Sequence, residues 1–109
     1  MNQFRWRPHK EFHRVANVED IPPGTGIVAR VGGRDVALFN VEGTFFAIDN
    51  ACPHAGAPIG VRRFDGRIVT CGYHGMRFDV TTGVCPDSAG WCAESYEVRV
   101  VDGQVEVAL

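Results

Sequence analysis

Hydrophobic and polar residues alternate in two parts of the chain, as they do in β-strands with one buried face. The first part predicts strands over residues 12–16, 27–31, 35–41 and 44–49, and the second over 96–101 and 104–108. Three of the gaps between successive strands hold pairs that tight hairpin turns favour, namely Gly32-Gly33, Glu42-Gly43 and Asp102-Gly103. No stretch shows the periodicity of an amphipathic helix. The pattern therefore predicts an all-β protein.

A region of different composition separates the two β parts. Residues 50–92 are rich in Gly, Pro, Cys and His, and they hold one short strand pair near residues 67–70 and 77–80. Loops carried on a rigid frame are where binding and catalytic residues concentrate. We therefore expect one domain over residues 1–109, with an extension over residues 1–11 and a functional region over about 50–92.

Composition and charge narrow the class of protein. The chain has 109 residues, 45% of them hydrophobic, and 13 Gly and 6 Pro favour a turn-rich β domain with one core. A formal net charge of −2 excludes a strongly basic chain built to hold nucleic acid. Residues 1–14 carry a net +3 and the remainder a net −5, so the body of the protein suits a basic partner surface.

The cysteines are interpreted through the expected compartment. No apolar run reaches the roughly 20 residues that span a bilayer, and the polar start Met-Asn-Gln-Phe-Arg does not resemble a signal peptide. We therefore expect a cytoplasmic protein with no membrane contact, in which cysteines serve metal or redox chemistry more often than disulfides. Cys85 and Cys92 remain open to three roles: a disulfide, alternative metal ligands, or thiols that bind nothing.

Two pairs of metal-ligand residues stand out in the central region. They are Cys52-Pro-His54 and Cys71-Gly-Tyr-His74, with 16 residues between His54 and Cys71. Two thiolates and two imidazoles can hold one tetrahedral zinc ion, or they can be divided between two irons. The residue types alone leave both metals open.

The residues around these pairs resemble the Rieske [2Fe-2S] family. Cys52-Pro-His-Ala-Gly-Ala-Pro-Ile and Cys71-Gly-Tyr-His-Gly-Met-Arg-Phe-Asp resemble its two cluster loops, and Thr82-Gly-Val-Cys-Pro resembles the third loop, which covers the cluster. The likeness extends over about residues 12–108. It implies an antiparallel β-sandwich or barrel-like fold with an inserted cluster-binding subdomain of loops. It also implies one cluster per chain, with Cys52 and Cys71 on one iron and His54 and His74 on the other.

Departures from the family pattern indicate a subclass. Respiratory Rieske proteins carry an extra cysteine in each cluster loop, where this chain has Ala57 and Tyr73. They also carry Ser and Tyr hydrogen-bond donors, where this chain has Met76 and Phe78. Fewer donors leave the charge on sulfur less stabilised, which predicts the low end of the Rieske range of about −150 to +300 mV. In these features the chain resembles the soluble ferredoxins of multicomponent aromatic-ring oxygenases.

That resemblance implies an electron carrier and not an enzyme. It would take single electrons from a flavin-dependent NAD(P)H reductase and pass them to a terminal Rieske non-haem iron oxygenase. Two alternatives stay open. One is a small subunit resembling that of assimilatory nitrite reductase, and the other is a zinc-stabilised binding module that uses the same cysteines and histidines.

Overall fold

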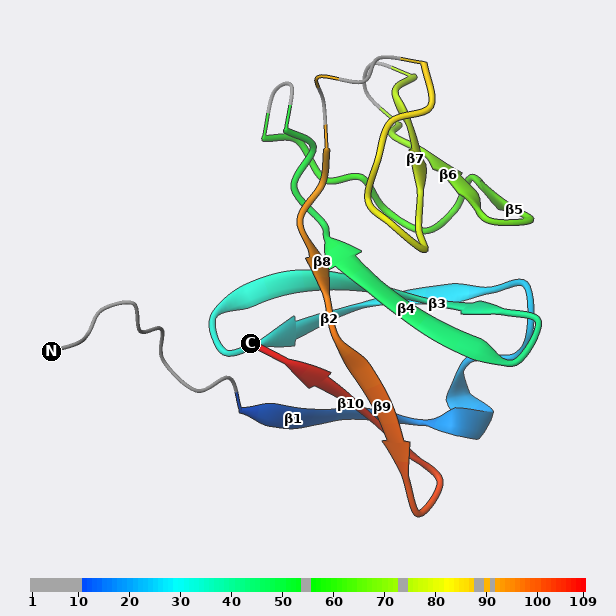
Figure 1. Cartoon of the computed structure of the whole chain (residues 1–109), viewed down its shortest axis with the longest axis vertical. Helices are drawn as coiled ribbons and strands as arrows, with labels where there is room; N and C mark the ends of the chain where they lie inside the picture. The colour runs from blue at the N-terminus through cyan, green and yellow to red at the C-terminus, as the bar shows by residue number, and fades with distance from the viewer. Residues whose placement is uncertain (1–10, 54–55, 73–74, 88–89, 91) are drawn as a thin grey trace, which may run out of the picture.

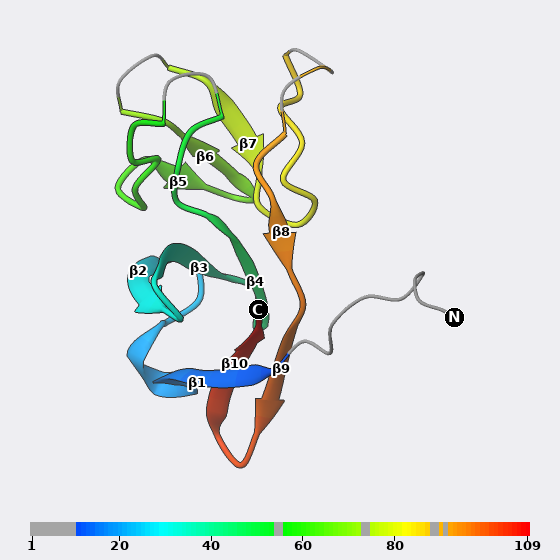
Figure 2. The ribbon, with the colours of Figure 1, turned by 90° about the vertical axis from the view of Figure 1, so that its left-hand side faces the viewer.

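Three antiparallel sheets are stacked in layers, as the two views in Figures 1 and 2 show. The computed structural model describes residues 11–53, 56–72, 75–87, 90 and 92–109. Within these ranges the regular structure is β apart from a single 3-10 turn, η1 (Val18–Asp20), and no helix is long or apolar enough to cross a membrane. The all-β, antiparallel fold that the sequence predicts is therefore confirmed.

Two of the sheets form a sandwich, and the third belongs to a separate subdomain. The outer sheet of the sandwich has the strand order β1 (Phe12–Asn17), β10 (Gln104–Ala108), β9 (Val98–Val101). The middle sheet has the order β2 (Gly26–Val31), β3 (Arg34–Val41), β4 (Thr44–Asp49), β8 (Ser95–Tyr96). The third sheet, in the order β5 (Phe64–Asp65), β6 (Ile68–Thr70), β7 (Arg77–Asp79), lies within residues 50–92, which we call the loop subdomain.

The middle sheet lies between the outer sheet and the loop subdomain, and its strand β3 is buried on both faces. On β3, Val36 and Leu38 belong to the core shared with the outer sheet. Ala37 and Phe39 belong to the core of the loop subdomain. A strand covered on both faces has no polar side to expose, which accounts for the unbroken run of apolar residues between Asp35 and Asn40. The loop subdomain is thus anchored on a rigid sheet.

The sandwich strands lie where the hydrophobic pattern predicts them, with one break. Both residues of each predicted turn pair have positive φ, so the three hairpins are confirmed. The stretch over 96–101 is not one strand, however. Tyr96 pairs with β4 in the middle sheet, whereas Val98 begins the pairing with β10 in the outer sheet. The chain changes sheets at Glu97, which helps to join the two layers.

The loop subdomain contains the predicted strand pair and one strand that the sequence did not indicate. β6 and β7 pair in antiparallel register at the expected place, from Ile68↔Asp79 to Thr70↔Arg77. The two-residue β5 adds a third strand beside β6. Of the predicted extension over residues 1–11, only Glu11 lies within the described residues, and it exchanges two backbone hydrogen bonds with Leu109.

Candidate metal centre

The two cysteine loops are built alike. In the first, the Cys52 N–H donates to the Ala57 carbonyl at 2.7 Å, and the Gly56 N–H donates to the Cys52 carbonyl at 2.6 Å. In the second, the Cys71 N–H donates to the Met76 carbonyl at 2.7 Å, and the Gly75 N–H donates to the Cys71 carbonyl at 3.1 Å. In each loop, the cysteine N–H therefore donates to the carbonyl five residues later, and the cysteine carbonyl accepts the N–H four residues later. The two loops thus have the same turn.

A glycine makes this turn possible in each loop. Gly56 has φ +72 and Gly75 has φ +70, a left-handed conformation that costs other residues roughly 1–2 kcal/mol. The shared spacing Cys-x3-Gly in the sequence is the local signature of this geometry. The sequence shows this spacing in both motifs, but the spacing alone does not predict that the two loops repeat one conformation.

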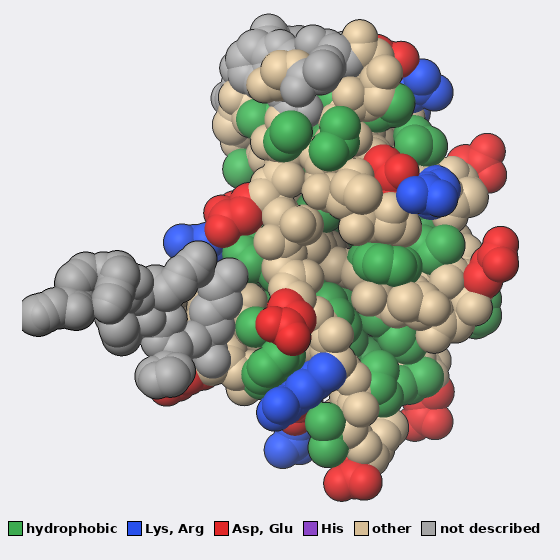
Figure 3. Space-filling model, viewed as in Figure 1, with side chains coloured by type: hydrophobic (Ala, Val, Ile, Leu, Met, Phe, Trp, Pro, Cys, Tyr) green, Lys and Arg blue, Asp and Glu red, His purple; other side chains and the backbone are tan. Residues whose placement is uncertain are grey.

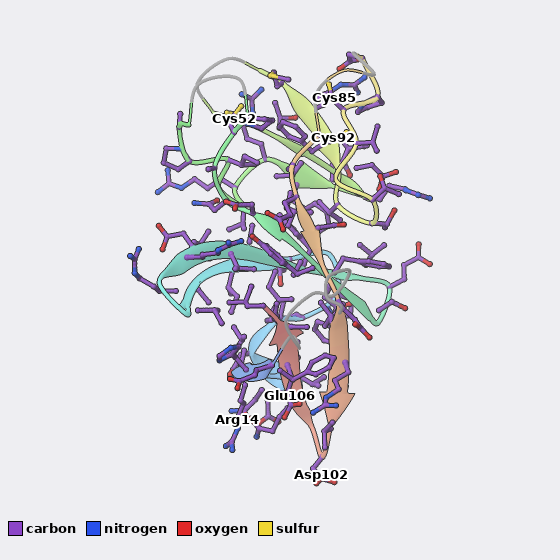
Figure 4. The ribbon with its side chains drawn as sticks, turned by 60° about the vertical axis from the view of Figure 1, so that its left-hand side comes forward. Arg14, Cys52, Cys85, Cys92, Asp102 and Glu106 are labelled. Carbon is purple, nitrogen blue, oxygen red and sulfur yellow. The ribbon has the colours of Figure 1, made fainter. Side chains whose placement is uncertain are left out.

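The loops also contact one another through their thiols. Cys52 Sγ lies 3.9 Å from Met76 Sδ in the second loop, and Cys71 Sγ lies 4.0 Å from the carbonyl oxygen of Pro58 in the first loop. Both cysteines are fully buried and belong to one core with Phe78. Two thiols from two separate loops are therefore brought into one water-excluded region, at the end of the molecule opposite the Asp102 turn (Figure 4).

The first loop is fixed to the end of β4 by Asn50. This side chain is only 7% exposed, and its Oδ1 accepts the Gly60 N–H at 2.9 Å. The Asn50 carbonyl accepts the Ile59 N–H at 2.6 Å, and its own N–H donates to the Asp35 carbonyl. A buried amide with these partners connects both ends of the first loop to the middle sheet, so Cys52 emerges at a defined position.

The Tyr96 hydroxyl, where β8 pairs with β4, also helps to fix the start of the first cysteine loop. The Tyr96 hydroxyl accepts a hydrogen bond from Arg34 at 3.0 Å and donates one to Asp49 Oδ2 at 3.1 Å. Burial raises the pKa of Tyr96, and the neighbouring carboxylates of Asp49 and Glu94 add to the effect. The phenol is therefore neutral at physiological pH and serves as a fixed hydrogen-bonding bridge beneath the first loop.

A third loop follows β7 and returns toward β8. Val84 and Cys92 form an isolated antiparallel bridge across it, and Arg77 holds Asp87 through two hydrogen bonds of 2.8 and 2.7 Å. The Arg77 guanidinium lowers the pKa of the Asp87 carboxyl. The loop that the family resemblance assigned to cover the cluster is thus joined by a charged fork to the strand that leaves the second cysteine loop.

The remaining cysteines differ in their surroundings. Cys85 is buried in the same core as Cys52 and Cys71, whereas Cys92 is exposed. Neither is in a disulfide in this structure. Figure 4 shows both on the third loop, to one side of Cys52.

The donor set fits the cluster that the sequence implies, as far as the described residues reach. Two buried thiols, from loops of the same geometry, supply the pair of cysteine ligands that one iron of a Rieske cluster needs. His54 and His74 lie outside the described residues, two and three positions beyond the cysteines. Their role as ligands to the second iron stays a prediction.

Comparison with known proteins gives the family. The model of the Rieske-like [2Fe-2S] domain matches residues 11–108. Ferredoxin CarAc of Metapseudomonas resinovorans is 34% identical over 99 residues, covering 87% of this chain and 91% of that protein. The ferredoxin component of the naphthalene 1,2-dioxygenase/salicylate 5-hydroxylase systems of a Ralstonia species is 41% identical over 69 residues. That match covers 63% of this chain and 66%, just under two thirds, of the relative. The chain belongs to the Rieske-like [2Fe-2S] domain family.

Solved structures agree with this assignment. A complex of reduced oxygenase and oxidized ferredoxin in carbazole 1,9a-dioxygenase contains a similar chain, with a TM-score of 0.79 and 33% identity over 89% of this chain and 92% of that one. The small subunit of nitrite reductase (NADH) from Salmonella typhimurium is also related, at 30% identity over 104 residues, or 89% of this chain and 96% of that one. The relatives of this chain thus include both ferredoxins of oxygenase systems and a nitrite reductase small subunit, which is one of the two alternatives that the sequence leaves open.

Proposed function

We propose that the protein is a Rieske ferredoxin that carries single electrons to a terminal aromatic-ring-hydroxylating oxygenase and does no catalysis of its own. The observation that carries this proposal is the pair of cysteine loops, which repeat one turn and bury two thiols in one core. The ferredoxin components among its relatives support the same role.

Cys52 and Cys71 would hold one iron of the cluster, and His54 and His74 the other. The bound cluster would supply a single reversible redox step, with a potential raised by neutral imidazoles in place of two thiolates. The protein's own contribution is rigidity and exclusion of water. Because both thiols are fully buried and their backbones are fixed by the two turns, little rearrangement is needed when the charge changes.

The side chains beside the thiols favour a low potential within the Rieske range. Met76 contacts Cys52 through a thioether, which donates no hydrogen bond. Phe78 is fully buried and has no hydroxyl. Without O–H donors at these two positions, negative charge on sulfur is less stabilised. A low potential of the cluster suits a protein that takes its electrons from a reduced flavin, which is itself a low-potential electron donor.

The partners follow from the relatives. A similar chain is seen in complex with an oxygenase, which supports a terminal oxygenase as acceptor. We propose a flavin-dependent NAD(P)H reductase as the electron donor, since a one-electron carrier needs a flavin to divide the two electrons of a nicotinamide. Dependence on NAD(P)H supports the cytoplasm as the compartment.

The nitrite reductase small subunit is the second candidate, because a member of that class covers nearly the whole chain. The two functions differ in partner and not in fold. Co-purification with a sirohaem protein in place of a flavoprotein reductase would favour the second candidate.

Substitution of the four ligands tests the proposed site. Cys52→Ser, Cys71→Ser, His54→Ala and His74→Ala should each abolish or convert the cluster, as measured by iron content and the visible spectrum. Cys85→Ser and Cys92→Ser are the matched controls and should keep both. A His74→Ala protein with an unchanged spectrum, or loss of iron from the Cys85 variant, would show that the ligands are assigned wrongly.

A further inference from the structure

Charge is divided unevenly between the two ends of the molecule. The loop subdomain, residues 50–92, has four arginines and three acidic residues, whereas residues 11–49 and 93–109 of the sandwich have four arginines and ten acidic residues. The formal charges at pH 7 are therefore +1 and −6, and residues 1–10 carry the remaining +3. The acidic body that the sequence indicates is the sandwich alone, and the end that carries the cysteine loops is not acidic.

Two of the four arginines in the loop subdomain are neutralised within it. Arg67 pairs with Asp79 at 3.0 Å and Arg77 with Asp87 at 2.7 Å. Figure 3 shows acidic and basic side chains, red and blue, adjoining each other on the upper half of the molecule. Arg62 and Arg63 are exposed, and neither forms an ion pair with any residue that the structure describes. Their positive charge is available to another molecule.

These two arginines border a small hollow beside the cysteine loops. The hollow has a volume of about 150 Å³ and is lined by Ile59, Gly60, Arg62, Arg63, Thr70 and Gly72. Gly72 directly follows the ligand candidate Cys71, and the Thr70 N–H donates to the Arg63 carbonyl at 2.9 Å. Figure 2 shows residues 59–63 as the green segment that leads into β5, on the outer side of the loop subdomain. Two cations that form no ion pair with a described residue thus lie beside the loop that carries Cys71.

We propose that Arg62, Arg63 and this hollow form a docking face for a carboxylate-bearing patch on the electron-accepting oxygenase, an inference that rests on the proposed function. Arginine forks bind carboxylates in a fixed geometry, and an interface core favours arginine beside apolar surface. The sandwich, with its charge of −6, would be repelled by the same acidic patch. Attraction at the loop subdomain and repulsion at the sandwich would therefore orient the protein, so that the loop subdomain faces the acceptor as the two molecules approach.

The test measures electron transfer from the reduced, iron-loaded protein to two haem proteins of opposite charge: acidic cytochrome b5 and basic cytochrome c. The variants are Arg62→Gln, Arg63→Gln and the double substitution. Arg14→Gln is the matched control, because Arg14 is exposed, forms no ion pair with a described residue and lies at the far end from Cys52 (Figure 4). Rates are measured by stopped flow at low and high ionic strength.

With cytochrome b5, the wild-type rate should fall as salt rises, because salt screens an attraction. The double variant should be slower at low salt by about tenfold and equal to the wild type at high salt, and Arg14→Gln should retain the wild-type rate. The single variants should lie between the two. With cytochrome c, the double substitution should not slow the reaction at low salt.

Three results would overturn the proposal. One is a double variant with the wild-type rate and salt dependence. Another is a wild-type rate with cytochrome b5 that rises with salt. The third is a wild-type protein that has twice its monomer mass at low salt while the double variant stays monomeric. That result would show that the face binds the acidic sandwich of a second copy of this chain. A colourless, redox-silent protein would refute the proposed function as well, and its spectrum shows this before any acceptor is added.

Discussion

Among single residues, Gly83 is one where both conformation and packing require glycine. Its φ is +83, and a Cβ built there would overlap the Ala93 carbonyl oxygen. Its N–H donates to the Asp79 carbonyl at 2.6 Å and its carbonyl accepts the Ala93 N–H at 2.7 Å. The residue therefore fixes the point at which the third loop leaves β7 and returns toward β8.

Gly83→Ala should destabilise the protein more than Gly24→Ala does. Gly24 has the same φ of +83 but nothing within 4 Å of an added Cβ, so its substitution costs only the left-handed strain of roughly 1–2 kcal/mol. Gly83→Ala should lose about 1–3 kcal/mol more, because the added methyl has no room. Urea unfolding of the two variants measures the difference. Equal losses would show that the Ala93 carbonyl moves aside at little cost.

At the scale of elements, the Arg77–Asp87 fork joins β7 to the third loop. Its two short hydrogen bonds place a carboxylate opposite a guanidinium, and the arginine lowers the pKa of Asp87. A carboxyl with a lower pKa in the folded state stabilises the fold above its unfolded pKa, which is about 3.9 for Asp. That contribution is lost as pH falls through the lowered pKa.

Asp87→Asn should therefore lower the free energy of unfolding at pH 7 by an amount that shrinks as pH falls below about 4. Urea unfolding of both proteins between pH 7 and pH 3 measures it. Arg77→Gln should show the same pH profile, and the double variant should add nothing to either single one. A difference between the wild type and Asp87→Asn that stays constant over this range would contradict the role given to the fork.

Elements whose signals are local could be predicted from the sequence. The sandwich hairpins combine an alternating pattern with turn residues that accept positive φ, and both signals lie within a few residues of each other. The break between β8 and β9 could not be predicted, since it depends on the pairing of Tyr96 with Ala47 in β4. β5 is two residues long, and its pairing with β6 gives no pattern of its own.

For the molecule as a whole, the sequence indicates the chemistry of the site more fully than its construction. The spacing of Cys52, His54, Cys71 and His74 is enough to suggest a ligand set. That each thiol contacts the opposite loop could not be predicted, because the contact of Cys52 with Met76 depends on how the middle sheet carries both loops. The uneven division of charge also required the fold, since net charge averages over both ends.

The central claim is that the protein carries a Rieske cluster of low potential, and an optical redox titration of the anaerobically purified protein tests it most directly. The account predicts a coloured protein that bleaches reversibly in a one-electron step, at the negative end of the range of about −150 to +300 mV. A protein that titrates above about +150 mV would contradict the effect assigned to Met76 and Phe78. A colourless protein that contains zinc would contradict the cluster itself.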